Sequence, residues 1–75
     1  MIGIIGAMAS EVDGLKAKMT DCKTETVSGV EFCSGTINRT QTVVAQAGVG
    51  KVNAAVTAQT MILKYGVDAV INIGV

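Results

Sequence analysis

The sequence lacks histidine, proline and tryptophan, and its aromatic residues are one Phe and one Tyr. Two cysteines are present, Cys22 and Cys33, eleven positions apart. Because of this spacing they form no CxxC redox pair, and because no histidine accompanies them they form no zinc site. We expect two reduced, inert thiols, as is usual in cytoplasmic proteins.

An excess of charge of either sign is also missing, since six Lys and Arg residues balance six Asp and Glu residues. Nucleic-acid binding requires clustered positive charge, and the basic residues are scattered. No basic segment precedes the first apolar run, and no apolar stretch approaches the roughly 18 residues of a membrane-spanning helix. We therefore expect a cytoplasmic protein that binds neither nucleic acid nor membrane.

Hydrophobic residues nevertheless make up 49% of the 75 residues, and they are mainly Ala, Val, Ile, Met and Leu. This mixture is typical of a parallel sheet that helices cover on both faces. A chain of this length buries only about 60% of its unfolded surface, which leaves a lone domain marginally stable. The sequence also stops at residues 72–75, where a strand is expected to open into a loop. We expect residues 1–75 to form a single incomplete α/β domain.

The apolar run at residues 2–6 predicts a central strand that is buried on both faces. Ser10 is expected to cap the following helix, with Asp13 completing an imperfect capping box. That helix is predicted to end near residues 19–21, where poor helix formers gather.

A period of two over residues 24–47 predicts a meander of strands, with a tight hairpin at residues 37–40. A second helix is predicted over residues 51–65, closed by Gly66 as a left-handed cap. Its polar residues form a narrow stripe, which predicts that almost the whole helix is buried. This polar stripe consists of Asn53, Thr57, Thr60 and Lys64. A last strand is predicted at residues 69–73, which completes a β-α-β unit.

One acid, Glu11, stands where the first strand passes into the first helix. Ligands of open α/β sheets bind outside the carboxyl ends of the strands, where loops and helix N-termini converge. Acids are also common in the first turn of a helix, because the N–H groups there favour negative charge. Glu11 is thus either a site residue or a helix-dipole residue, and its position alone favours the second interpretation.

The glycine turn at residues 48–51 invites comparison with phosphate-binding loops. A Walker loop needs Gly where Ala45 stands and Ser or Thr where Val52 stands. A dinucleotide fingerprint needs Gly or Ala at Asn53. The turn is therefore interpreted as a tight strand-to-helix connection whose N–H groups face the site.

Three segments together give a more specific indication: IGIIGAM with a Glu three positions after the Met, AGVGKVNAA at residues 47–55, and DAVINIG at residues 68–74. In this order and spacing the sequence resembles the amino-terminal segment of bacterial methylthioadenosine/S-adenosylhomocysteine nucleosidases, which belong to the nucleoside phosphorylase superfamily. The resemblance implies the amino-terminal portion of a three-layer α/β sandwich with a mixed central sheet. It also implies an enzyme of methionine salvage that hydrolyses an adenine thionucleoside, needs no cofactor and works as a homodimer.

The resemblance implies that Glu11 handles the attacking water. Ala7 and Met8 are implied to lie beside the ribose and this water, and Val49 to form an apolar wall at the thio end. Related phosphorylases carry a Gly-Asp-Pro turn after the first strand, which this proline-free sequence lacks, so water is the expected nucleophile. The family's purine-protonating and ribose-binding residues lie beyond residue 75.

One position departs from the pattern, since Val75 stands where many relatives have Ser. A related purine nucleosidase, such as a futalosine hydrolase, therefore stays an alternative. An alternative from another class is a non-catalytic βαβ module for small-ligand binding or oligomerisation, with Glu11 as a helix-dipole residue.

Overall fold

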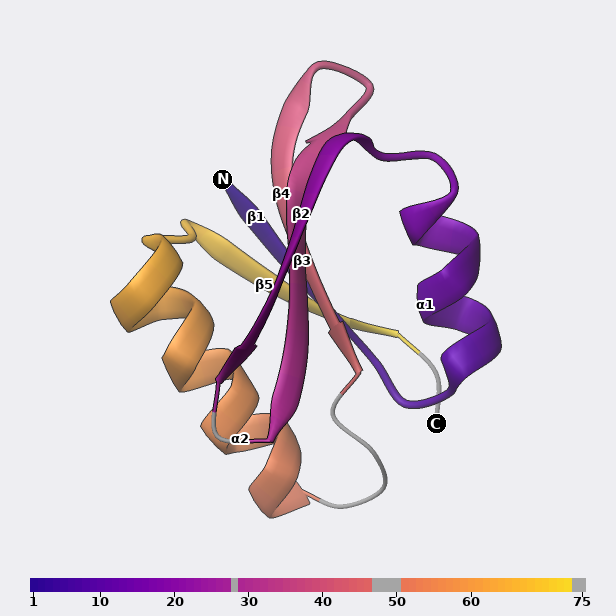
Figure 1. The fold of residues 1–75 in the computed structure, drawn as a ribbon. Helices are drawn as coiled ribbons and strands as arrows, with labels where there is room; N and C mark the ends of the chain where they lie inside the picture. The colour runs from indigo at the N-terminus through magenta and orange to yellow at the C-terminus, as the bar shows by residue number, and fades with distance from the viewer. Residues whose placement is uncertain (28, 47–50, 74–75) are drawn as a thin grey trace.

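A computed structural model describes residues 1–27, 29–46 and 51–73 (Figure 1). Five strands form one mixed sheet in the order β2-β3-β4-β1-β5. The strands are β1 (Ile2–Gly6), β2 (Thr20–Val27), β3 (Val30–Ile37), β4 (Thr40–Gln46) and β5 (Ala69–Ile73). The helical segments are α1 (Ala9–Lys16), α2 (Lys51–Thr60) and the π-helical turn η1 (Met61–Tyr65).

Strand β1 lies inside the sheet, parallel to β4 on one side and to β5 on the other. Strand β3 pairs antiparallel with both β2 and β4, which forms the predicted meander. The β-α-β unit formed by β4, α2 and β5 therefore crosses over β1 instead of joining adjacent strands. Gly6 at the end of β1 is level with Gln46 of β4 and Ile73 of β5. The carboxyl ends of all three parallel strands thus meet at one edge of the sheet.

Helices α1 and α2 lie on opposite sides of the sheet (Figure 1). A side chain on Gly6 would meet Val12 of α1, whereas one on Gly3 would meet Met61 of η1. Residues three apart in a strand point to opposite faces. The expected three-layer α/β arrangement with a mixed central sheet is therefore confirmed.

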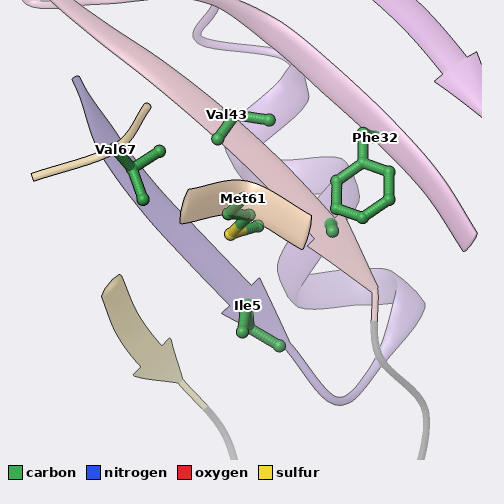
Figure 2. Packing of buried hydrophobic residues seen from close by; sticks show 6 residues of the cluster. Ile5, Phe32, Val43, Met61 and Val67 are labelled. Carbon is green, nitrogen blue, oxygen red and sulfur yellow. The ribbon is translucent and has the colours of Figure 1, made fainter. Parts of the chain in front are cut away.

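The larger part of the core lies between the sheet and the α2–η1 segment (Figure 2). Met61 has no exposed surface and packs into a cluster contributed by β1, β3, β4 and the segment after η1. Full burial of one such side chain contributes roughly 1.5–3 kcal/mol. The members of this cluster are Ile5, Phe32, Val43, Ala45, Met61 and Val67.

The hairpin between β3 and β4 has the predicted geometry. Asn38 and Arg39 have φ angles of 48° and 67°, so both central residues of the turn are left-handed, as in a type I′ turn. Gly29, with φ 78°, lies in the turn between β2 and β3. An irregularity lies opposite Gly35 of β3, where β2 has a register shift between Thr20 and Lys23.

The first helix differs from its predicted boundaries. Its N-cap is Met8 rather than Ser10, and Glu11 rather than Asp13 occupies the third helical position. The helix also ends at Lys16, before the predicted region at residues 19–21, because β2 already begins at Thr20. Pairing of β2 with β3 takes these residues from the helix, which shows tertiary context overriding local propensity.

The second helix is less buried than its sequence pattern predicts. Thr57, assigned to the solvent stripe, is 1% exposed, whereas the apolar Leu63 is 76% exposed. Val56 and Ile62 are exposed as well. The predicted left-handed cap at Gly66 is confirmed, with φ 67°. Within the described segments, no helix has the length and hydrophobicity to cross a membrane.

Candidate active site

The candidate site lies at the edge where β1, β4 and β5 end. The chain leaves β1 at Gly6, passes through Ala7 and Met8, and enters α1 at Ala9. Glu11 therefore sits in the first turn of α1, directly beyond the carboxyl end of the central parallel strand. This is the position where open α/β sheets bind ligands.

The Glu11 carboxylate is held by the backbone of the turn that precedes the helix. Met8 N donates a hydrogen bond of 3.3 Å to Oε1 of Glu11. In return, the backbone N–H groups of Glu11 and Val12 donate to the Met8 carbonyl at 3.2 and 3.3 Å. A helix start, with its unpaired N–H groups, is a position where acidic side chains are common. None of the three ion pairs found among the described side chains includes Glu11.

Three of the four predicted site residues lie within the described part of the structure. Ala7 is half-buried in the turn, and Met8 is 60% exposed. Glu11 is half-buried. The structure thus brings these three residues together at one strand end. Val49 lies outside the described residues, and its predicted role stays a prediction.

A polar cluster that sequence reasoning missed lies between α1 and the antiparallel strands. Lys16 Nζ forms a 2.7 Å ion pair with Oε1 of Glu31, and this hydrogen bond raises the pKa of Lys16. Cys33 lies in the same cluster, with its Sγ 3.5 Å from Oγ1 of Thr24. Desolvation, followed by the nearby Cys33, raises the pKa of Cys22. The cysteines are therefore neighbours, because the β2–β3 hairpin brings together residues eleven positions apart.

A second cluster joins β2 to η1 on the other face. The Tyr65 hydroxyl donates a 2.7 Å hydrogen bond to Oε1 of Glu25, and Lys64 Nζ lies 3.4 Å from Oε2. Burial, followed by this hydrogen bond, raises the pKa of Tyr65 to about 12. The Tyr65 hydrogen bond lowers the pKa of Glu25. Both clusters tie secondary structure together, and neither includes Glu11 or the turn that follows β1.

An open depression of about 290 Å³ is lined by Met1, Gly35 and Gln41, among others. Met1 and Gln41 lie near the starts of β1 and β4, so this depression is at the opposite edge of the sheet from Glu11. In the described residues, no three acidic or cysteine side chains gather as a metal site requires. Among the features described, the strand ends around Glu11 remain the best candidate for chemistry.

Comparison with known proteins gives one consistent family. The family model described as the phosphorylase superfamily matches residues 1–75. The 5′-methylthioadenosine/S-adenosylhomocysteine nucleosidase of Shewanella loihica is 48% identical over 73 residues, which are 97% of this chain and 32% of the relative. The chain therefore spans about a third of the length of the curated relatives that it matches.

Solved structures agree with the sequence comparison. The nucleosidase of the same type from Colwellia psychrerythraea, in complex with adenine, has a TM-score of 0.91 and 42% identity. This match covers 95% of the chain and 29% of that structure. Futalosine hydrolase of Helicobacter pylori has a TM-score of 0.86 and 35% identity, with 99% and 32% coverage.

Proposed function

The chain belongs to the phosphorylase superfamily, and on this premise we propose that it supplies part of the active site of an N-glycosyl hydrolase. The proposed substrates are 5′-methylthioadenosine and S-adenosylhomocysteine, and adenine is the released base. Such a protein would carry this incomplete domain together with the remaining two thirds of its relatives' length. The observation that carries the proposal is the half-buried Glu11, whose carboxylate is held by Met8 N–H beyond the end of β1.

In the proposed reaction a water molecule attacks the anomeric carbon of the ribose. Glu11 accepts a proton from this water as the new C–O bond forms. The N-glycosidic bond breaks, and its electron pair leaves with the adenine. An acid outside this chain protonates the departing base. A positioned general base contributes roughly a hundredfold to ten-thousandfold to such a step.

The residues at the strand end favour water over phosphate as the nucleophile. Glu11 carries a negative charge close to the proposed reacting carbon, and this charge repels a phosphate dianion. The turn is Gly6-Ala7-Met8, with no basic residue in it, and the only Arg, Arg39, is at the tip of the β3–β4 hairpin. A hydrolase therefore fits this end of the sheet better than a phosphorylase does.

We assign substrate contacts to Ala7 and Met8, which flank Glu11 in the same turn. Met8 is 60% exposed, so its thioether is available to a bound molecule, whereas a core methionine would be covered. Val49 is proposed to line the thio end of the pocket. A Val49→Phe change should then weaken S-adenosylhomocysteine more than methylthioadenosine, because its 5′ group is longer. Equal losses in kcat/KM for the two substrates would contradict this assignment.

The test of the function is adenine release by the intact protein and by its Glu11→Gln variant. Gln keeps the volume and hydrogen-bonding reach of Glu but has no basicity. At saturating methylthioadenosine we expect turnover to fall by about a hundredfold or more. Stability should change by less than about 1 kcal/mol, measured as a denaturant midpoint. Unchanged turnover would make Glu11 a helix-dipole residue and refute its role as the base, whereas a lack of adenine release by the intact protein would favour a non-catalytic βαβ module.

Futalosine hydrolysis is the second candidate, since a futalosine hydrolase matches this chain with a TM-score of 0.86. The same Glu11 chemistry serves both reactions, so only the substrate separates them. Comparison of kcat/KM for futalosine and methylthioadenosine decides between the two. The homodimer and the cytoplasmic location stay predictions, and light scattering of the intact protein tests the first.

A further inference from the structure

The last residue of β1 is a buried glycine that lies against the helix carrying Glu11. A methyl group on Gly6 would lie 2.8 Å from Cγ2 of Val12, closer than side-chain carbons pack. It would also lie 3.8 Å from Cβ of Glu11 and 3.8 Å from Cγ1 of Ile73. A side chain on Gly6 would therefore meet α1, the proposed base and the end of β5 at a single point.

We propose that Gly6 is a positioning residue for the Glu11 carboxylate, because its missing side chain lets α1 pack directly on the end of β1. This inference rests on the proposed function of Glu11. Gly6 itself touches no reacting atom. Its contribution is the close approach of helix and strand, which fixes where the first turn of α1 stands relative to the strand ends.

Val12 cannot easily make room for a side chain at Gly6. It is 2% exposed and is the buried residue of α1, so it is surrounded by packed atoms. A valine in a helix is also largely confined to one χ1 rotamer. Relief of the crowding must therefore come from movement of the α1 backbone, and Glu11 is the adjacent residue. A displacement of about 1 Å at a catalytic group can cost about a hundredfold in rate.

Gly3 provides a matched control on the same strand. A methyl group there would lie 2.7 Å from Sδ of Met61, an equally short contact on the opposite face of the sheet. A thioether is flexible and adapts to irregular space. An alanine at residue 3 therefore disturbs the α2–η1 side of the core and leaves α1 and Glu11 in place.

The experiment compares Gly6→Ala, Gly3→Ala, Val12→Ala and the double variant Gly6→Ala/Val12→Ala in the intact protein. For methylthioadenosine we expect Gly6→Ala to lower kcat by about tenfold to a hundredfold. KM should stay within about threefold, because the base acts on water in the transition state. Gly3→Ala should keep kcat within about twofold of the parent. The double variant should recover most of the lost kcat, because removal of Cγ2 of Val12 removes the short contact.

Two results would overturn the inference: equal kcat values for Gly6→Ala and Gly3→Ala, or no recovery in the double variant. If Gly6→Ala does not fold, the double variant tests the role of Gly6. The inference then requires the double variant both to fold and to turn over substrate, and failure of either contradicts it. The Glu11→Gln variant distinguishes a failure of the proposed function of Glu11 from a failure of the positioning role of Gly6. Wild-type turnover in Glu11→Gln refutes the proposed base, whereas an inactive Glu11→Gln beside a fully active Gly6→Ala refutes only the role of Gly6.

Discussion

The hydroxyl of Tyr65 and the carboxylate of Glu25 are joined by a 2.7 Å hydrogen bond across forty positions of sequence. Tyr65 ends the π-helical turn η1, and its ring lies 5.7 Å, centroid to centroid, from that of Phe32 in the core. Glu25 is on β2, at the edge of the sheet. This contact connects β2, the antiparallel strand at the edge of the sheet, to the α2–η1 segment that links the parallel strands β4 and β5.

The Tyr65 contact predicts an unusual ionisation in alkali. We expect the phenol of Tyr65 to be half-ionised at about pH 12, compared with its ordinary value of 10.0. Because its pKa is raised in the folded state, its contribution to stability is complete below about pH 10 and is lost as the pH rises towards 12. The absorbance difference between the protein and its Tyr65→Phe variant isolates this titration. A midpoint at 10 would show that the contact does not persist in solution.

Thr57 gives a prediction of increased stability. Its Oγ1 is buried and has no hydrogen-bond partner within the described part of the chain. Val has the same shape without the hydroxyl, so Thr57→Val should raise the free energy of unfolding by about 1 kcal/mol. Thr60→Val is the control, because Thr60 Oγ1 donates to the Val56 carbonyl at 2.9 Å and has a bond to lose. Denaturant midpoints measure both; destabilisation by Thr57→Val would mean that the hydroxyl is hydrogen-bonded.

The β3–β4 hairpin carries strain that one substitution removes. Arg39 is exposed and has φ 67°, which costs a non-glycine residue about 1–2 kcal/mol. Gly adopts this conformation freely but loses more entropy on folding, so Arg39→Gly should stabilise the protein by about 0.5–1 kcal/mol. Arg39→Lys removes the guanidinium and keeps the strain, so its melting temperature should stay that of the parent. A gain from Lys equal to that from Gly would assign the effect to charge.

The two cysteines should differ in reactivity although they are neighbours. Cys22 is exposed and Cys33 is buried, so iodoacetamide should modify Cys22 in the native protein and Cys33 only after unfolding. The thiolate is the reactive form, and the pKa of Cys22 is raised, so its modification should be slow at neutral pH and accelerate in alkali. Peptide mass mapping reads out each site, and Cys22→Ser should leave the native protein unmodified. Labelling of native Cys33 would show that the β2–β3 hairpin opens.

Much of this fold can be predicted from local patterns in the sequence. The apolar run of β1 and the glycine cap at Gly66 each depend on a few neighbouring residues, and both are confirmed. The same holds for the tight hairpin between β3 and β4. The position of Glu11 beyond a strand end is also readable, because it follows directly from where β1 stops.

Features that depend on distant partners were not predictable in this way. Pairing of β2 with β3 shortens α1, and the residues of α1 themselves contain no signal that the helix ends early. Thr57 is polar but buried, while the apolar Leu63 is exposed, so side-chain polarity did not predict which face of α2 and η1 is buried. The proximity of Cys22 and Cys33 requires the register of the hairpin, including the shift between Thr20 and Lys23.

The interior position of β1 has a consequence for the order in which the chain assembles. Among the five strands β1 is synthesised before its two neighbours. Its Ile2 pairs with Thr42 of β4 and with Ala69 of β5. At about 5–20 residues per second, several seconds of synthesis separate β1 from its second neighbour. The local β2–β3–β4 meander can form in that interval, whereas contacts of such long sequence separation form slowly. Of the five strands, the one that leads to Glu11 is therefore synthesised before the others and enclosed after them.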